Sequence, residues 1–247
     1  MPKQRSQPPA PRKRPDFARE REKAEKKPSG PELRSEQVAI VLLGAFNPSI
    51  FQPWWMVHQG LIDEEEAESA EVGIVHPEVV SFKTGPISIE VTRDRFQAQT
   101  EDATAVEALR DLVIGSFARL SHTPIAAMGV NRSTHHQMPT RESWNEIGHK
   151  LLPKEPWNDI LREPGTRNLT VEGKRPDDQT GYIRAIFEPS AVVEHGIFQM
   201  VNDHFQFNDG DPKKNIRASE AMDVLAETWD ASLARAQEIV ERILSYA

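Results

Sequence analysis

The chain contains no cysteine, which excludes disulfides, thiolate metal sites and cysteine nucleophiles. It also lacks a long apolar run, because the longest, residues 38–46, is far shorter than the roughly 20 residues of a membrane helix. The N-terminus is positively charged, but no apolar stretch of about 7 to 15 residues follows it, as a secretion signal requires. We therefore expect a cytoplasmic protein that does not enter the membrane.

Contiguous enzyme motifs are missing as well. The sequence has no phosphate-binding Walker loop, no G-x-G-x-x-G after a strand and no G-x-S-x-G nucleophile turn. These absences weaken an enzymatic interpretation without excluding it, because hydrolases and nucleases with dispersed carboxylates have no contiguous motif. We expect no cofactor and no metal site.

Charge is divided unevenly along the 247 residues. Residues 1–34 hold eleven Lys and Arg and five Asp and Glu, a net charge of +6. Since the whole chain has a net charge of −8, the other 213 residues have a net charge of −14. The same segment holds seven of the nineteen prolines and few large apolar residues. Such a segment cannot bury enough apolar surface to offset the entropy lost on ordering. The sequence therefore predicts a disordered, basic, proline-rich arm over residues 1–34 and a single domain over residues 35–247.

Apolar patterns after residue 35 predict blocks of strands separated by single helices. This order is typical of an α+β fold with a largely antiparallel sheet, helices on one face and a long C-terminal helix. Both halves, residues 35–138 and 139–247, contain an antiparallel meander followed by an amphipathic helix, which suggests an internal duplication. The predicted strands are residues 38–43, 72–76, 79–84, 87–92, 95–99, 125–132, 168–172, 182–188 and 196–207, and the main helices cover residues 106–120, 144–151 and 218–246. A capping box over residues 104–107 is expected to begin the first of these helices.

Histidines are the first candidates for chemistry. His135 and His136 are adjacent, and neighbouring residues on a strand point to opposite faces, so one metal ion could take both only if they lay in a loop. A loop or interface role is the better interpretation. In the last strand Asn202 and His204 share a polar face and Asp203 and Phe205 share an apolar one, which predicts a half-buried strand. A hydrolase or nuclease would need His136, Asp203 and His204 to converge.

Two further pairs are candidates for binding. Trp54 and Trp55 lie about 100° apart on a helix, so both cannot face one core and one is expected at a boundary or interface. Asn131 and Arg132 end a strand of small residues and are also candidate binding residues. The arm adds five basic candidates: Arg12, Lys13, Arg14, Lys26 and Lys27.

The stretch Ile87-Ser-Ile-Glu-Val-Thr-Arg-Asp-Arg95, a helix over residues 106–120 and the stretch Pro124-Ile-Ala-Ala-Met-Gly-Val-Asn-Arg132 follow one another in this chain. This arrangement resembles a sporadically distributed, uncharacterised family of bacterial proteins, over about a third of the chain. Ala126, Ala127 and Met128 stand where that family's strand is rich in arginine. The resemblance implies a bacterial accessory protein, from a defence or mobile-element setting, and no established activity.

Three functions follow from these patterns. The first is a non-catalytic binding or assembly protein whose basic arm engages an acidic surface on a protein partner or on a second copy. The second is a nucleic-acid-associated accessory protein, although a −14 body would be repelled by a polyanion and the arm has a single aromatic residue, Phe17. The third is the hydrolase or nuclease built on the two histidines and Asp203. The first explains both the charge division and the missing motifs.

Overall fold

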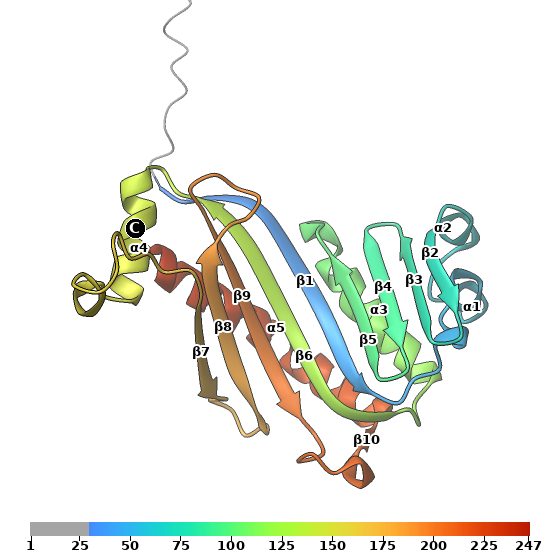
Figure 1. The fold of residues 1–247 in the computed structure, drawn as a ribbon. Helices are drawn as coiled ribbons and strands as arrows, with labels where there is room; N and C mark the ends of the chain where they lie inside the picture. The colour runs from blue at the N-terminus through green and yellow to red at the C-terminus, as the bar shows by residue number, and fades with distance from the viewer. Residues whose placement is uncertain (1–29) are drawn as a thin grey trace, which may run out of the picture.

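The structure, a computed structural model, describes residues 30–247 and is built on one ten-stranded sheet (Figure 1). The strand order is β2-β3-β4-β5-β1-β6-β9-β8-β7, with β10 also paired to β6, and every pairing is antiparallel. The predicted antiparallel α+β fold is confirmed. The strands are β1 (Glu32–Gly44), β2 (Glu71–His76), β3 (Val79–Thr84), β4 (Ile87–Thr92), β5 (Arg95–Thr100), β6 (Pro124–Gln137), β7 (Leu169–Lys174), β8 (Gly181–Pro189), β9 (Gly196–Gln206) and β10 (Ile216–Arg217).

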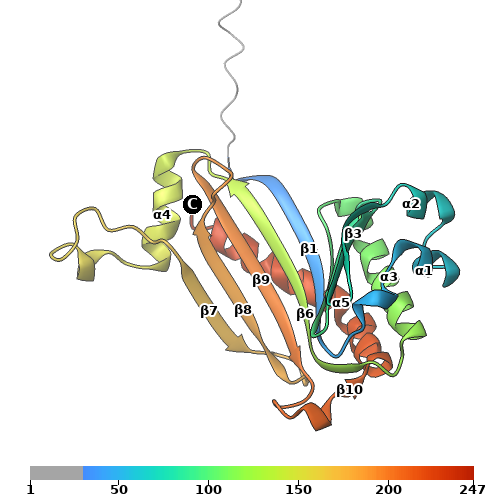
Figure 2. The ribbon, with the colours of Figure 1, turned by 45° about the vertical axis from the view of Figure 1, so that its right-hand side comes forward.

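Helices pack on one face of this sheet. The helices are α1 (Pro53–His58), α2 (Glu64–Glu68), α3 (Val106–Arg119), α4 (Arg141–Leu151) and α5 (Ala218–Leu244). Helices α3 and α5 lie side by side behind the strands, and α5 crosses the middle of the sheet (Figures 1 and 2). The long C-terminal helix is therefore confirmed. Within residues 30–247, no helix combines the length and the apolar character that crossing a membrane requires.

The central strand β1 begins earlier than the sequence indicates. Its backbone pairs with β6 from Glu32 onward, and the Arg34 Nε donates to Gln137 Oε1 at 2.9 Å. The predicted boundary at residue 34 is therefore wrong, because residues 32–34 already belong to the sheet. The sequence does not indicate this strand end, because Glu32 and Arg34 are polar and Leu33 is exposed. Backbone pairing and side-chain hydrogen bonds hold it in the sheet, rather than apolar burial. Residues 1–29 of the predicted arm lie outside the described residues.

The two halves of the chain have similar connectivity, although the first meander (β2–β5) has four strands and the second (β7–β9) has three. Each starts with a long strand (β1 or β6), continues through short helical segments and a meander, and ends in a helix (α3 or α5). Strands β1 and β6 pair with each other, and each is flanked by the last strand of its own meander, β5 or β9. This order of elements agrees with an internal repeat, which stays a prediction. Its boundary lies between α3 and β6, however, not at residue 138, because β6 opens the second unit.

Large aromatic side chains fill the core between the sheet and the helices. Phe96 and Phe117 meet edge to face with ring centres 5.0 Å apart, and Trp229 of α5 is fully buried. The Trp229 Nε1 donates to Glu107 Oε1 at 3.1 Å, which joins α5 to α3. The predicted capping box at residues 104–107 is therefore not formed, because Asp102 caps the turn before α3 and Glu107 bonds the tryptophan instead.

The opposite face of the sheet has no helix over it in the described part of the chain (Figures 1 and 2). In central strands such as β1 and β9, alternation places apolar side chains toward the helices and the other set toward this side. In β9, for example, Val201, Asp203 and Phe205 are buried beneath α5, while Asn202 and His204 are only half-buried. The predicted two-faced pattern of this strand is confirmed. We call the helix-free side the uncovered face.

Candidate functional site

The uncovered face carries a groove of about 370 Å³ across its centre. Strand register places Gln97, Val41, Gly129, His204 and Tyr182 in one row across five neighbouring strands. The next row contains Ala39, Asn131 and Asn202. The groove is lined by Gln37, Ala39, Val41, Leu43, Arg95, Gln97, Met128, Gly129, Asn131, Ser133, Tyr182, Met200, Asn202 and His204. Side-chain amides dominate its polar surface.

Two asparagines form the floor of the groove. Asn131 and Asn202 are register partners on β6 and β9, and within residues 30–247 the side-chain oxygen of each is buried without a hydrogen-bond partner. The adjacent Gly129 keeps the space above them open, because a Cβ there would lie 3.3 Å from the Asn202 Oδ1. A buried amide oxygen without a partner is unfavourable, so these two acceptors favour a ligand that donates hydrogen bonds.

An aromatic pair forms one side of the groove. The rings of Tyr182 and His204 stack with centres 4.4 Å apart, and the Arg184 guanidinium carbon lies 4.7 Å from the centre of the Tyr182 ring. The His204 Nε2 lies 3.2 Å from Gln206 Oε1. The side-chain contacts of His204 are an aromatic ring and a neutral amide, so no carboxylate in the described part of the chain orients its imidazole for proton transfer.

Charge is balanced on the uncovered face, unlike the rest of the domain. Residues 30–247 contain 20 Lys and Arg against 34 Asp and Glu, a net charge of −14. In strands β1 to β9 beyond Arg34, the positions on this side carry four basic and four acidic residues. The acidic excess therefore lies on the helices, loops and edges. These eight residues are Lys83, Arg95, Lys174 and Arg184, and Glu71, Glu90, Glu172 and Glu188.

Asp203, a predicted catalytic candidate, lies on the helix side of the sheet. Its carboxylate accepts hydrogen bonds from Arg175 and from Arg235 of α5. The Arg175 side chain is 1 % exposed and also pairs with Asp177 at 2.6 Å. Hydrogen bonds from Arg175 hold the pKa of Asp177 below its usual value. This cluster ties α5 and the loop after β7 to β9, so Asp203 has a structural role in it.

The structure does not bring the three catalytic candidates together. His136 and Asp203 lie on the helix side, and His204 points to the uncovered face. His136 and Val130, the register partner of Asp203, are six positions apart on β6, which is about 20 Å of strand. Burial also lowers the pKa of His136, which favours its neutral form. In the described residues there is no cluster of three or more metal-binding side chains.

His135 and His136 lie on strand β6 rather than in a loop. His135 packs against Phe198 with the rings tilted by 44° and their centres 4.8 Å apart, and its Nδ1 lies 2.8 Å from the Ser190 Oγ. The two imidazoles point to opposite faces because consecutive residues of a strand alternate. Both therefore have packing roles in the described structure.

The predicted binding residues are dispersed. Trp54 is 48 % exposed on α1, whereas Trp55 packs on Phe51 with ring centres 5.7 Å apart. Asn131 lies in the groove, but Arg132 points to the helix side, where it donates to Glu36 and to Gln237. The five basic candidates of the arm, Arg12, Lys13, Arg14, Lys26 and Lys27, lie outside the described residues. Of the four candidates that the structure describes, Asn131 lines the groove, and Trp54, Trp55 and Arg132 do not.

Several groove residues were not anticipated from the sequence. Tyr182, Gln37, Gln97 and Arg95 belong to no motif. They lie on β8, β1 and β5, which the sheet brings together within five neighbouring strands. The signal that could have found them is alternation, since each is the polar member of an apolar–polar pattern. Alternation identifies which residues share a face of the sheet, but it does not give the order of the strands. The groove therefore could not be predicted from the sequence.

Because its side-chain amide oxygen has no hydrogen-bond partner in the described residues, Asn202 should contribute little to the stability of the fold. Asn202→Ala is expected to change the free energy of unfolding by less than about 0.5 kcal/mol, because no hydrogen bond of its side chain is lost. Asn208 is the matched control, since its amide donates to Asn215 Oδ1 at 2.8 Å and accepts from the Gly210 N at 3.0 Å. Asn208→Ala should lower stability by about 1–3 kcal/mol in urea unfolding. Equal losses in the two variants would contradict the assignment of Asn202 to ligand binding.

In comparisons with known proteins, no family model and no curated protein matches this chain.

Proposed function

We propose that this chain is a non-catalytic binding protein that docks an acidic protein partner on its uncovered face. The observation that carries the proposal is the one-sided arrangement of helices. It leaves a groove on the free side whose buried amide oxygens have no partner. Amide oxygens and amide N–H groups are the complement of a polypeptide backbone and of polar side chains.

Charge supports an acidic protein rather than a nucleic acid. The uncovered face is neutral overall, so it does not repel an acidic surface as the remainder of the −14 domain does. Arg95 also lines the groove, and its guanidinium donates to Gln97. A polyanion as long as a nucleic acid would extend past the neutral face and meet the acidic edges.

The basic N-terminal segment supports the same class of partner. Residues 1–29 contain ten Lys and Arg and four Asp and Glu, and they join the sheet through β1, a central strand of the groove. A net charge of +6 tethered there increases the encounter rate with an acidic partner. We therefore propose that the segment draws the partner in and that the groove provides the specific contacts.

Contacts of His204 support binding over catalysis. Its neighbours in the groove are Tyr182 and Gln206, and Asp203 points to the other side of the sheet. A general base needs a partner that orients its ring and a reacting group within about 3 Å. An amide-lined groove instead provides directional hydrogen bonds without acid–base chemistry.

Site-specific photo-crosslinking in the source cells tests the proposal. The full chain carries p-benzoylphenylalanine at Gln97 on the uncovered face or at Glu238, an exposed residue of α5. We expect a discrete protein adduct from position 97 and at most a tenth of its yield from position 238. Replacing Arg12, Lys13, Arg14, Lys26 and Lys27 by Gln in the same chain should lower the yield at low ionic strength, because the attraction is electrostatic.

Two outcomes would overturn the proposal. Equal protein adducts from both positions would show that the uncovered face is not selective. A nucleic-acid adduct from position 97, with no protein adduct, would assign the groove to the other class of partner.

A further inference from the structure

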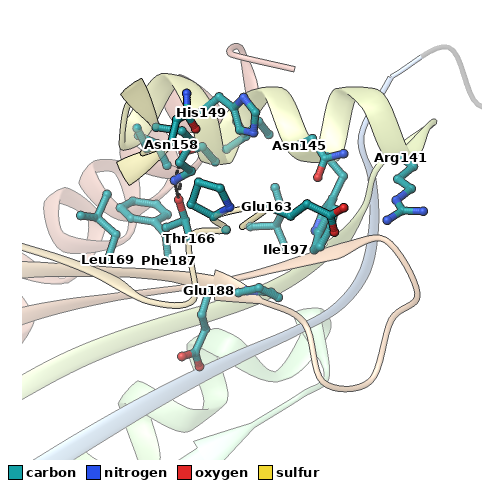
Figure 3. Close-up of a pocket in the computed structure, with 18 residues that line it drawn as sticks. Arg141, Asn145, His149, Asn158, Glu163, Thr166, Leu169, Phe187, Glu188 and Ile197 are labelled. Atoms are coloured by element: carbon teal, nitrogen blue, oxygen red, sulfur yellow. Dashed lines mark hydrogen bonds between the residues drawn. The ribbon is translucent and has the colours of Figure 1, made fainter. Parts of the chain in front are cut away.

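A second cavity, of about 470 Å³, lies at the end of the sheet and shares no lining residue with the groove (Figure 3). Helix α4, the loop of residues 152–168, and the adjoining ends of β7, β8 and β9 surround it. This volume falls in the usual range of small-molecule sites, roughly 300–1,000 Å³. The groove proposed for the protein partner does not use this cavity.

Lys154 is the unusual residue of this cavity. It is 8 % exposed, although lysine is almost never buried without an ionic partner. Its Nζ donates to the Gly148 carbonyl at 3.3 Å and to the Thr166 Oγ1. The Thr166 hydroxyl donates to the same carbonyl at 3.0 Å. These bonds fix the amine at the cavity wall and use two of its three N–H donors.

No carboxylate neutralises this amine. No acidic side chain in residues 30–247 lies within 4.0 Å of the Lys154 Nζ, whereas Arg175, the other buried cation in these residues, pairs with two aspartates. Glu163 and Glu188 line the cavity, but Figure 3 shows the Glu163 carboxylate on the Arg141 side and Glu188 pointing away. A buried cation without a counter-ion is unfavourable.

The remaining wall is largely apolar. Trp144, Ile147, Leu169 and Phe187 line it, and the Trp144 Nε1 is already bonded to the Gly196 carbonyl at 2.9 Å. The indole therefore offers the cavity its ring surface rather than a donor. An apolar body fits this wall, and a negative charge fits the amine.

We propose that this cavity binds a small amphipathic monocarboxylate, with its carboxylate on Lys154 and its apolar body against α4 and β8. Arg141 also lines the cavity, but Figure 3 shows it on the side of the Glu163 carboxylate. At the Lys154 end a single ammonium group balances a single negative charge, which favours a monocarboxylate over a phosphate ester. Desolvation lowers the pKa of Lys154, and a bound carboxylate would reverse this by stabilising the charged amine.

Calorimetric titration of the full chain tests the site. The probes are octanoate and 2-naphthoate, and their controls are the uncharged octanamide and 2-naphthamide. Lys154→Met keeps the length of the side chain and removes its charge. We expect it to weaken binding of the acids about 10- to 100-fold and to leave binding of the amides unchanged. Lys150→Met is the matched control, because this exposed lysine of α4 donates to the Tyr246 carbonyl at 2.8 Å, and it should bind both acids normally.

Unchanged affinity of the acids for Lys154→Met would overturn the proposal. If that variant fails to fold, the unaltered chain decides the question, because it must prefer each acid over its amide by about tenfold or more. Equal binding of acid and amide, or no binding of either acid, would contradict the site. Neither result bears on the groove, since photo-crosslinking there is independent of Lys154.

Discussion

Asp203→Asn is expected to lower the free energy of unfolding by about 3–5 kcal/mol. The carboxylate is buried and accepts hydrogen bonds from two guanidinium groups, those of Arg175 in the loop after β7 and of Arg235 on α5. Removing its charge leaves the deeply buried Arg175 with one remaining carboxylate partner, the more exposed Asp177. Breaking a buried ion pair is strongly destabilising because the other charge stays desolvated.

The geometry around Arg175 prevents easy relaxation. Its guanidinium carbon lies 3.7 Å from the centre of the Phe205 ring, and its Nη1 also donates to the His204 carbonyl at 3.3 Å. The guanidinium is therefore held between β9 and the loop after β7, and it cannot turn toward solvent without unpacking Phe205, which is fully buried.

Guanidinium chloride or urea unfolding of the full chain measures this effect. Glu238→Gln is the control, because Glu238 forms an exposed pair with Arg242 at 2.8 Å and its loss should change stability by less than about 0.5 kcal/mol. A loss of less than 1 kcal/mol for Asp203→Asn would contradict the structural role given to this cluster. It would also return Asp203 to the list of candidates for chemistry.

Local patterns in the sequence were sufficient for most of the elements. The steps of 3 and 4 residues between Met222, Leu225 and Trp229 predict α5, and the alternation around Asn202 and Asp203 predicts a two-faced strand. Both are local properties of the chain, and both are confirmed. The Asp102 cap was not predicted, because Thr104 and Glu107 have the spacing of a capping box. In the structure Glu107 instead accepts a hydrogen bond from Trp229, 122 residues later in the chain.

Contacts between distant segments could not be predicted in this way. Pairing of β1 with β6 creates the groove, and it depends on the packing of two meanders rather than on either strand alone. Arg235 reaches Asp203 across 32 residues, and no pattern in the sequence marks that pair. Lys154 stands between Pro153 and Glu155 in a polar loop, where a solvated lysine is the ordinary expectation.

Adding negative charge to the uncovered face is expected to weaken partner binding about tenfold or more at low ionic strength. Gln37→Glu with Gln97→Glu places two carboxylates in the groove with almost no change in side-chain shape. Like charges brought together at an interface repel, and desolvation on docking increases the penalty. The unfolding transition should change little, because neither glutamine is buried.

A charge-matched control separates this effect from the overall charge. Ala226→Glu with Ala231→Glu adds the same two charges to exposed positions of α5, on the far side of the sheet. A partner guided by net charge alone would be weakened equally by both pairs. A partner docked on the uncovered face would respond mainly to the first pair.

The deciding measurement is the dissociation constant of the protein captured at position 97, determined for the unaltered chain and for these two double variants. An increase of about tenfold or more for Gln37→Glu with Gln97→Glu, and less than about twofold for Ala226→Glu with Ala231→Glu, is the predicted result. Equal changes for the two, or a larger change for the α5 pair, would contradict docking on the uncovered face.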